Sequence, residues 1–123
     1  MERVELATVN HFTLMKQHLT PDSKVDDLVQ IAGDVGGLHA TGVTTPYLSL
    51  FARARSFEKA NLDEELYEER TLAKIRCVRN TIYVHPKEAI PFVFRATVGV
   101  VVPRLLIAAS SCVKVRAIST PSA

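Results

Sequence analysis

The 123-residue chain has few residues that build covalent or metal-linked frameworks. Its two cysteines, Cys77 and Cys112, form no Cys-x-x-Cys pair, and neither stands at zinc-finger spacing from a histidine. Two cysteines in a domain of this length indicate reduced thiols rather than a disulfide framework. We therefore expect no structural metal site.

Several nucleotide-binding and catalytic motifs are also missing. The chain contains no Gly-rich phosphate loop, no Gly-x-Ser-x-Gly nucleophile elbow and no His-Glu-x-x-His pair. These absences argue against a nucleotide hydrolase, a serine hydrolase of the elbow type and a zinc protease. No cofactor is expected.

Signals for export or membrane insertion are absent as well. The first residues, Met1 to Glu5, lack the apolar region of a secretory signal. Two apolar runs near the C-terminus are separated by Pro103 and Arg104, and each is shorter than the roughly 20 residues that span a bilayer. We expect a cytoplasmic protein that does not associate with membranes.

Acidic residues are missing from the last part of the chain. All 13 lie at or before Glu88. The net charge of the whole chain is +2, and 47% of its residues are apolar. A mildly basic protein binds nucleic acid where its lysines and arginines share a face. The change in composition near Thr97 predicts a domain over residues 1–97 and a divergent tail over residues 98–123. The tail is either a truncated or frame-altered ending or a genuine one.

The part of the chain before the tail is predicted to be mostly helical. In the first helix, Val9, Phe12, Met15 and Leu19 recur at the spacing of one buried helical face. Helices are expected near residues 6–19, 24–35, 46–55, 62–70 and 87–96.

Local signals define where these helices begin and end. Ser23 is the expected N-cap of the second helix, and Gly36-Gly37 is its expected end. Asn61 is expected to open the fourth helix, with Glu64 three residues later. The buried sides of the later helices are expected to include Val25, Leu28, Val29, Ala32 and Val35, then Tyr47, Leu50, Phe51 and Ala54, and finally Ile90, Val93 and Phe94.

Two half-buried strands are predicted near residues 72–79 and 81–85. Ile75, Cys77, Ile82 and Val84 alternate with polar or aromatic residues, and Asn80 tolerates the geometry of a hairpin turn. Short helices followed by a hairpin are typical of a winged helix. The predicted fold class is therefore α+β, mostly α, with a small antiparallel hairpin.

Three separated blocks resemble the winged-helix DNA-binding family that includes the alkyl-base and crosslink DNA glycosylases. The family typically reads Gly-Leu-Gln-Ala-Gln in the first block and Arg-Gly-Thr-Leu in the last. In this chain the blocks are Gly36-Gly37-Leu38-His39-Ala40-Thr41, Tyr47-Leu48-Ser49-Leu50-Phe51-Ala52-Arg53 and Arg79-Asn80-Thr81-Ile82. The resemblance runs from about Leu6 to Thr97 and covers the first module only. Full-length relatives look like tandem modules wrapped around DNA. The resemblance thus implies DNA as a partner and leaves open self-association through an exposed inter-module surface.

The resemblance also identifies a candidate catalytic pair. The positions of the two family glutamines, thought to hold a water molecule, are occupied by His39 and Thr41. The His39 imidazole could accept a proton from that water, and Thr41 could add one hydroxyl bond. Alternatively, both residues only cap the ends of neighbouring helices. Asp34 could orient His39, or it could be a solvated helix residue.

The predicted hairpin carries the candidate DNA-binding residues. Lys74 and Arg76 alternate along one strand, so both could reach phosphates. Arg79 would point to the opposite face of the strand unless the turn begins there. Asn80 and Thr81 have short side chains that can donate hydrogen bonds to the DNA backbone. The alternative is an ordinary solvated strand face.

Other charged and imidazole side chains receive structural interpretations. Arg53 and Arg55 close the third helix, where cations favour the negative end of the helix dipole, and Arg53 is expected to form a salt bridge with an acid within residues 64–69. His11, His18 and His85 are interpreted as surface or boundary residues.

Three functional hypotheses follow. The first is a winged-helix DNA-binding domain, a fragment of a larger DNA-binding protein, without catalytic activity on its own. The second is a DNA glycosylase that acts on alkylated or crosslinked bases through His39 and Thr41. The third is a non-catalytic interaction module or a functionless remnant.

Overall fold

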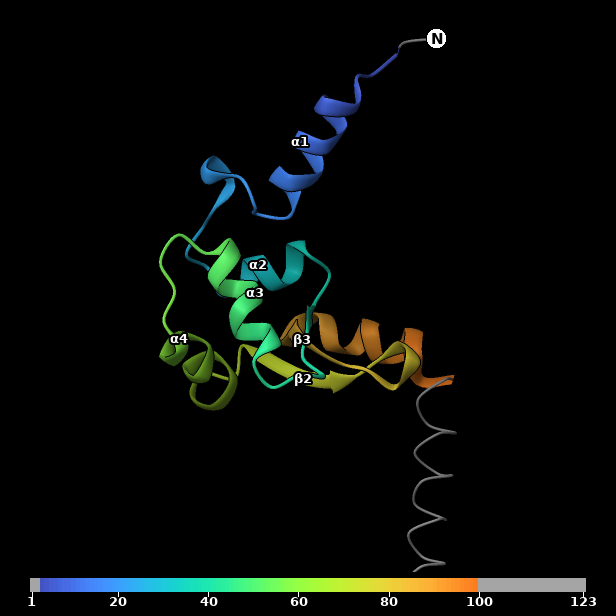
Figure 1. The fold of residues 1–123 in the computed structure, drawn as a ribbon. Coiled ribbons are helices and arrows are strands. Elements are labelled where there is room, and N and C mark those ends of the chain that lie inside the picture. The colour runs from blue at the N-terminus through green and yellow to red at the C-terminus, as the bar shows by residue number, and fades with distance from the viewer. Residues whose placement is uncertain (1–2, 100–123) are drawn as a thin grey trace, which may run out of the picture.

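The computed structural model describes residues 3–99 and has a mostly helical α+β fold with one three-stranded antiparallel sheet (Figure 1). The predicted fold class is therefore confirmed. In chain order the elements are α1 (Leu6–Lys16), the 3-10 turn η1 (Pro21–Ser23), α2 (Leu28–Asp34), β1 (Leu38–His39), α3 (Thr45–Arg53), α4 (Lys59–Asp63), the π-helical turn η2 (Glu64–Glu68), β2 (Leu72–Arg76), η3 (Val78–Asn80), β3 (Ile82–Pro86) and η4 (Lys87–Ala89). A further helix, over residues 90–99, follows η4.

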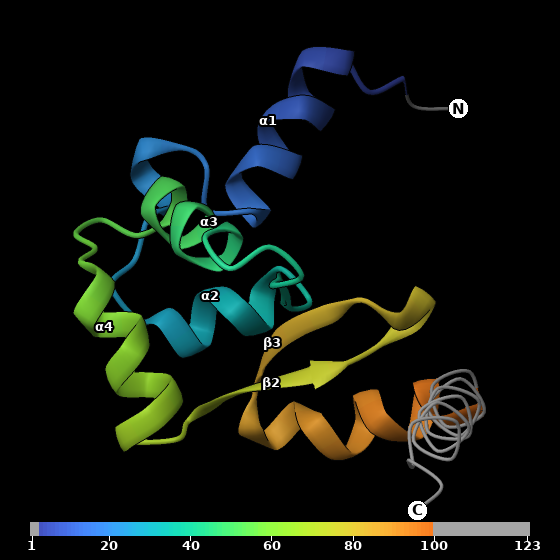
Figure 2. The ribbon, with the colours of Figure 1, turned by 60° about the horizontal axis from the view of Figure 1, so that its bottom comes forward.

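The sheet has the strand order β1-β3-β2, and both pairings are antiparallel. Figure 2 shows α2 and α3 on one side of the β2–β3 hairpin and the helix of residues 90–99 on the other. The order α2–β1–α3–α4–β2–β3 is that of a winged helix, with α1 preceding it. The hairpin was predicted, whereas the two-residue strand β1 was expected to be loop.

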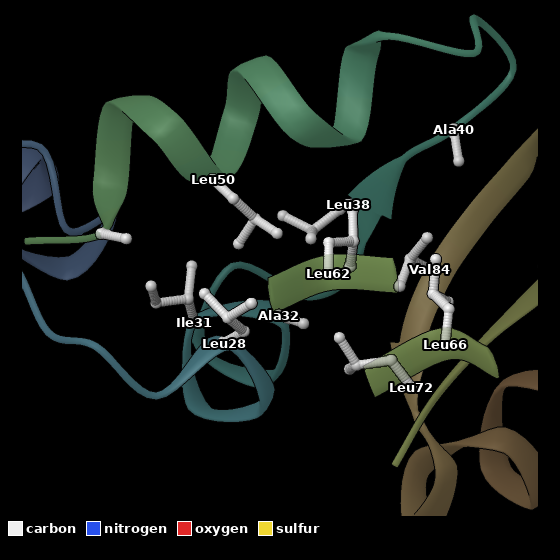
Figure 3. Close-up of a cluster of buried hydrophobic side chains, with 11 residues drawn as sticks. Leu28, Ile31, Ala32, Leu38, Ala40, Leu50, Leu62, Leu66, Leu72 and Val84 are labelled. Carbon is white, nitrogen blue, oxygen red and sulfur yellow. The ribbon is translucent and has the colours of Figure 1, made fainter. Parts of the chain in front are cut away.

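The hydrophobic core lies between the helices and the sheet face that Leu38 and Val84 share (Figure 3). Each fully buried aliphatic side chain stabilises the fold by about 1.5–3 kcal/mol relative to an exposed one. Leu28, Ala32, Leu50 and Ala54 are buried as predicted. The largest fully buried side chains are Ile31, Leu38, Leu50, Leu62, Leu72, Val84 and Pro46.

Helix α2 is shorter than predicted at its start and ends where predicted. Its N-cap is Asp27, whose Oδ1 accepts from the Gln30 backbone N–H at 3.0 Å. Ser23 is not the cap, because its hydroxyl is held within η1 by Thr20. At the other end the Gly37 N–H donates to the Ala32 carbonyl at 2.8 Å, and both glycines have positive φ, 75° at Gly36 and 106° at Gly37. This pattern is a Schellman-type ending.

The helix predicted near residues 6–19 exists as α1, but its predicted buried face is wrong. Val9, Phe12 and Met15 are 46%, 54% and 40% exposed, and Leu19, just past the helix, is exposed as well. α1 projects away from the sheet, and its C-terminal end lies near η1 and the end of α2 (Figure 1). The helical spacing predicted the helix correctly, but it could not show whether another element packs against the apolar face of that helix.

Two other aromatic side chains predicted to be buried are exposed. Phe51 is 67% exposed, whereas Leu50 of α3 and the C-cap residue Ala54 are buried on the inner side. Phe94 is 54% exposed, whereas Val93 and Thr97 take the inner side of the last helix.

The fourth helix begins at Lys59, three residues earlier than the predicted start at residue 62. Asn61 Oδ1 accepts from the Glu58 backbone N–H at 2.7 Å, so Glu58 is the N-cap and Asn61 the third helical residue. Within residues 3–99 no helix is long and apolar enough to cross a bilayer. Residues 100–123 of the predicted tail lie outside the described residues, and the boundary after Thr97 stays a prediction.

Candidate nucleic-acid interface

The β2–β3 hairpin ends in a tight turn that displays cationic side chains. Arg76 pairs with Ile82 in the last rung of the ladder, and the Cys77 N–H donates to the Thr81 carbonyl at 2.7 Å. Arg79 and Asn80 take positive φ angles of 58° and 64° inside this turn. The chain therefore reverses at Asn80, as predicted, and holds Arg76 and Arg79 at the end of the sheet.

The three hairpin cations are exposed, but their surroundings differ. Arg76 donates to Asn80 Oδ1 at 2.6 Å, which fixes its guanidinium over the turn. Lys74 lies in the middle of β2, and its Nζ is 3.4 Å from the Tyr67 hydroxyl and 5.8 Å from that ring's centroid. Among residues 3–99, none of Lys74, Arg76 and Arg79 lies within ion-pair distance of a carboxylate.

The two short polar residues of the turn have structural partners. Besides the Asn80 contact with Arg76, the Thr81 hydroxyl donates to the Val78 carbonyl at 2.6 Å. Both side chains thus shape the turn, and the Asn80 amide nitrogen keeps its donors.

The helix expected to read DNA in such a fold is acidic. In helix-turn-helix proteins the second helix of the pair enters the major groove, and here that helix is α4. The Lys59–Glu68 segment of α4 and η2 contains four acidic residues and one lysine. Like charges repel, so this surface is unfavourable against phosphates.

A polar network fixes α4 to α3. Asp63 accepts from Lys59 Nζ at 2.8 Å and from the Tyr47 hydroxyl at 2.6 Å. The hydrogen bonds from Lys59 and Tyr47 lower the pKa of Asp63, whereas the bond to Asp63 and burial raise the pKa of Tyr47 to about 12. Tyr47 therefore remains a donor, and the network joins the two helices in a fixed arrangement.

The structure brings the candidate catalytic pair together. His39 Nε2 lies 3.4 Å from Thr41 Oγ1, which in turn accepts from the Ile82 backbone N–H at 3.1 Å. The His39 ring also contacts Tyr83 edge to face, with centroids 5.2 Å apart. The interpretation as helix caps is wrong, since His39 belongs to β1 and Thr41 binds the start of β3.

Asp34 does not orient His39. Its Oδ2 lies 2.8 Å from His18 Nε2, and His18 Nδ1 is 2.6 Å from the Ser23 carbonyl. His18 has a φ of 56° and is buried, so its interpretation as a surface or boundary residue is wrong. The pair joins the end of α1 to the end of α2.

The predicted Arg53 salt bridge is not formed within the described residues. Its guanidinium turns back along α3 and donates to the Ser49 carbonyl at 3.1 Å and hydroxyl at 2.9 Å. Arg55 donates to the Lys24 carbonyl at 3.1 Å.

Sequence reasoning missed the residues on the second face of the sheet. The antiparallel register pairs Ile75 with Tyr83 and Ala73 with His85, so these side chains share one face. The helix of residues 90–99 covers that face and buries His85, which was predicted to lie at the surface or boundary. The apolar pattern of Ile90 and Val93 was the available signal.

Metal ligation receives no support from this geometry. Across residues 3–99 no three His, Cys, Asp or Glu side chains are grouped so that they could hold an ion.

Comparison with known proteins gives one match. The family model described as DNA glycosylase AlkZ-like matches residues 32–108, more than half of the chain. The match includes His39, Thr41 and the whole β2–β3 hairpin, and α1 precedes it. No curated protein and no solved structure matches the chain.

Proposed function

The chain belongs to the AlkZ-like DNA glycosylase family, and from this premise we propose that it is a winged-helix module that binds duplex DNA through its β2–β3 hairpin. One observation carries the proposal: the hairpin exposes Lys74, Arg76 and Arg79, and none of them is neutralised by a carboxylate among residues 3–99. Cations of this kind bind phosphates and release condensed counterions. We infer that the module works as part of a larger DNA-binding protein, without catalysis on its own.

The turn supplies the main contacts in this proposal. Arg76 and Arg79 lie at the end of the sheet, and the bond to Asn80 orders the Arg76 guanidinium before DNA arrives. Lys74 contributes less, because Tyr67 of the acidic turn η2 already contacts it. Asn80 and Thr81 hold the turn in shape and add short donors. In this arrangement we expect the acidic segment of α4 and η2 to lie away from the phosphates, because like charges repel.

The test is fluorescence anisotropy with short labelled duplexes of unrelated sequence over a range of salt concentrations. The variant Arg76→Gln/Arg79→Gln should weaken binding to every sequence alike. Each lost phosphate contact should reduce the slope of log affinity against log salt by about 0.9, so the double variant should lose roughly 1.8.

A matched control is Lys16→Gln/Lys59→Gln, which removes the same charge from α1 and α4. Its salt slope should stay close to that of the parent protein. Unchanged affinity in the hairpin variant, or equal loss in the control, refutes the proposed contact surface. In the companion variant Lys74→Gln/Arg76→Gln, we expect a smaller loss than in the turn variant.

A second candidate function is base excision, favoured by the proximity of His39 and Thr41. Both are exposed, and DNA lying on the hairpin could reach them because Thr41 and Arg76 flank Ile82 in the sheet. The paired amides of the family pattern are absent, however, so we expect no measurable excision by this chain alone.

Excision is tested by incubating alkylated duplex with the protein and scoring abasic sites. Release that disappears in His39→Ala would promote the glycosylase function over DNA binding alone.

A third candidate is an interaction module that self-associates. Exposed apolar side chains on α1, such as Leu6 and Phe12, and Phe51 on α3 provide the contact surface. A mass that rises with concentration in light scattering, together with no affinity for DNA, would favour this function.

A further inference from the structure

Helix α1 carries an uncovered face that is apolar in the middle and charged at both ends. The helix buries none of its residues, and Val9 and Phe12 are among its exposed apolar side chains. Glu5 is the N-cap of the helix, and Lys16 lies in its last turn. Among residues 3–99 neither of these two charges has an ion-pair partner. We call Glu5, Val9, Phe12 and Lys16 the α1 seam.

The spacing of the α1 seam is that of a helix which packs against another helix. Its four residues stand four, three and four positions apart along the chain. This alternation keeps side chains on one side of a helix and is the pattern of two helices packed side by side. The Lys16 ammonium lies 5.6 Å from the centroid of the Phe12 ring, so Lys16 turns toward the seam.

A second copy of the same helix fits this seam when it runs in the opposite direction. The spacing reads the same from either end, so an antiparallel pair places Val9 of each copy against Phe12 of the other. The same register places Glu5 of each copy against Lys16 of the other, and two-fold symmetry makes each contact twice. A parallel pair would oppose Glu5 to Glu5 and Lys16 to Lys16, and these like charges repel.

The attachment of α1 to the rest of the chain favours the same direction. His18, just past the helix, is buried, and its ring nitrogens lie 2.8 Å from Asp34 Oδ2 and 2.6 Å from the Ser23 carbonyl oxygen. The helix is therefore held at its C-terminal end and projects from the body of the module (Figures 1 and 2). Antiparallel pairing puts the two bodies at opposite ends of the helix pair, whereas parallel pairing would crowd them at one end.

We propose that α1 is a homodimerisation helix, which pairs antiparallel with α1 of a second copy through the α1 seam. A helix of 11 residues is about 16 Å long, so the interface is smaller than that of a standard stable complex, and the dimer is a weak one. The β2–β3 hairpin lies away from α1, so the pairing does not rest on the proposed DNA contacts. It gives the self-association considered above a partner helix and a register.

Charge reversal tests the register. Glu5→Lys and Lys16→Glu each oppose like charges in both pairs, so each variant alone should dimerise more weakly than the parent protein. Loss of two exposed ion pairs changes a dissociation constant by about 2- to 30-fold, and the repulsion between like charges adds to this. Mixed in equal amounts, the two variants oppose unlike charges again and should form a heterodimer about as tight as the parent dimer. Sedimentation equilibrium without DNA measures each of these dissociation constants.

Lys87→Glu is the matched control, because it reverses an exposed charge on η4, and it should dimerise like the parent protein. A parent protein that stays monomeric at every concentration overturns the inference. Charge variants that dimerise like the parent, or a mixture that associates no more tightly than either variant alone, also overturn it. The hairpin variant Arg76→Gln/Arg79→Gln should dimerise normally, so failure of this inference and failure of the proposed DNA binding are separate results.

Discussion

Replacing Gly37 by alanine perturbs the point where α2, β1 and His85 meet. The added methyl group would lie 2.3 Å from His85 Cε1 and 2.8 Å from Nδ1, and Gly37 also has a φ of 106°. Gly36 offers a matched control, because its φ is 75° but no atom lies within 4 Å of a Cβ placed there. Both substitutions strain the backbone, and only one of them creates a clash.

The expected magnitudes differ accordingly. A left-handed conformation costs a non-glycine residue about 1–2 kcal/mol, which is the whole effect expected for Gly36→Ala. Forcing an extra methyl group into a packed site costs about 1–3 kcal/mol more. Gly37→Ala should therefore lower the free energy of unfolding by roughly 2–5 kcal/mol.

Urea unfolding followed by circular dichroism measures the difference. At a typical m-value of about 2 kcal/mol per M, an extra 2 kcal/mol moves the midpoint by roughly 1 M beyond that of Gly36→Ala. In a His85→Ala background the two glycine substitutions should become equally costly, because the clash partner is gone. Equal midpoints for the two single variants would refute the contact between Gly37 and His85.

Three further predictions concern single groups. Asp27→Ala should lower the free energy of unfolding by about 1 kcal/mol through loss of the α2 N-cap, measured by the same urea titration. Burial lowers the folded-state pKa of His85, so stability should be full above the unfolded pKa of about 6.5 and decline below it until the folded pKa is passed; His85→Phe should remove that decline in thermal melts. Phe12→Lys should leave the melting temperature unchanged and lower any self-association seen by light scattering, since α1 buries no side chain.

The elements predicted correctly from sequence depend on local chemistry. Gly36-Gly37 ends α2 because both residues take positive φ, and Asn80 turns the hairpin for the same reason. The strand β1 was missed because two residues are too few to show an alternating pattern. Its existence depends on pairing with β3, which is distant in the chain.

Burial was less predictable than secondary structure. Phe12 and Phe51 stand at helical spacing, but whether they are covered depends on which elements pack against α1 and α3. His85 shows the opposite error, because the helix of residues 90–99 closes a sheet face that sequence alternation left open to solvent.

The candidate site, too, was predicted from the sequence only in part. His39 and Thr41 were identified from the block resemblance and lie 3.4 Å apart, and their catalytic role stays a prediction. The partner of Asp34 could not be predicted, since His18 precedes it by 16 residues and reaches it through the turn after α1. Tyr83 and its neighbours were missed because the packing of a helix on a sheet face has no sequence motif.

The acidic segment of α4 and η2 and the cationic hairpin turn lie at opposite ends of β2, as the ribbons in Figures 1 and 2 show. Charges separated in this way form an electric dipole along the sheet. Near a polyanion such a dipole experiences a torque that turns the cationic end forward before any contact is made. The module would thus reach a phosphate backbone already oriented, and added salt would slow this approach more than it would hasten departure.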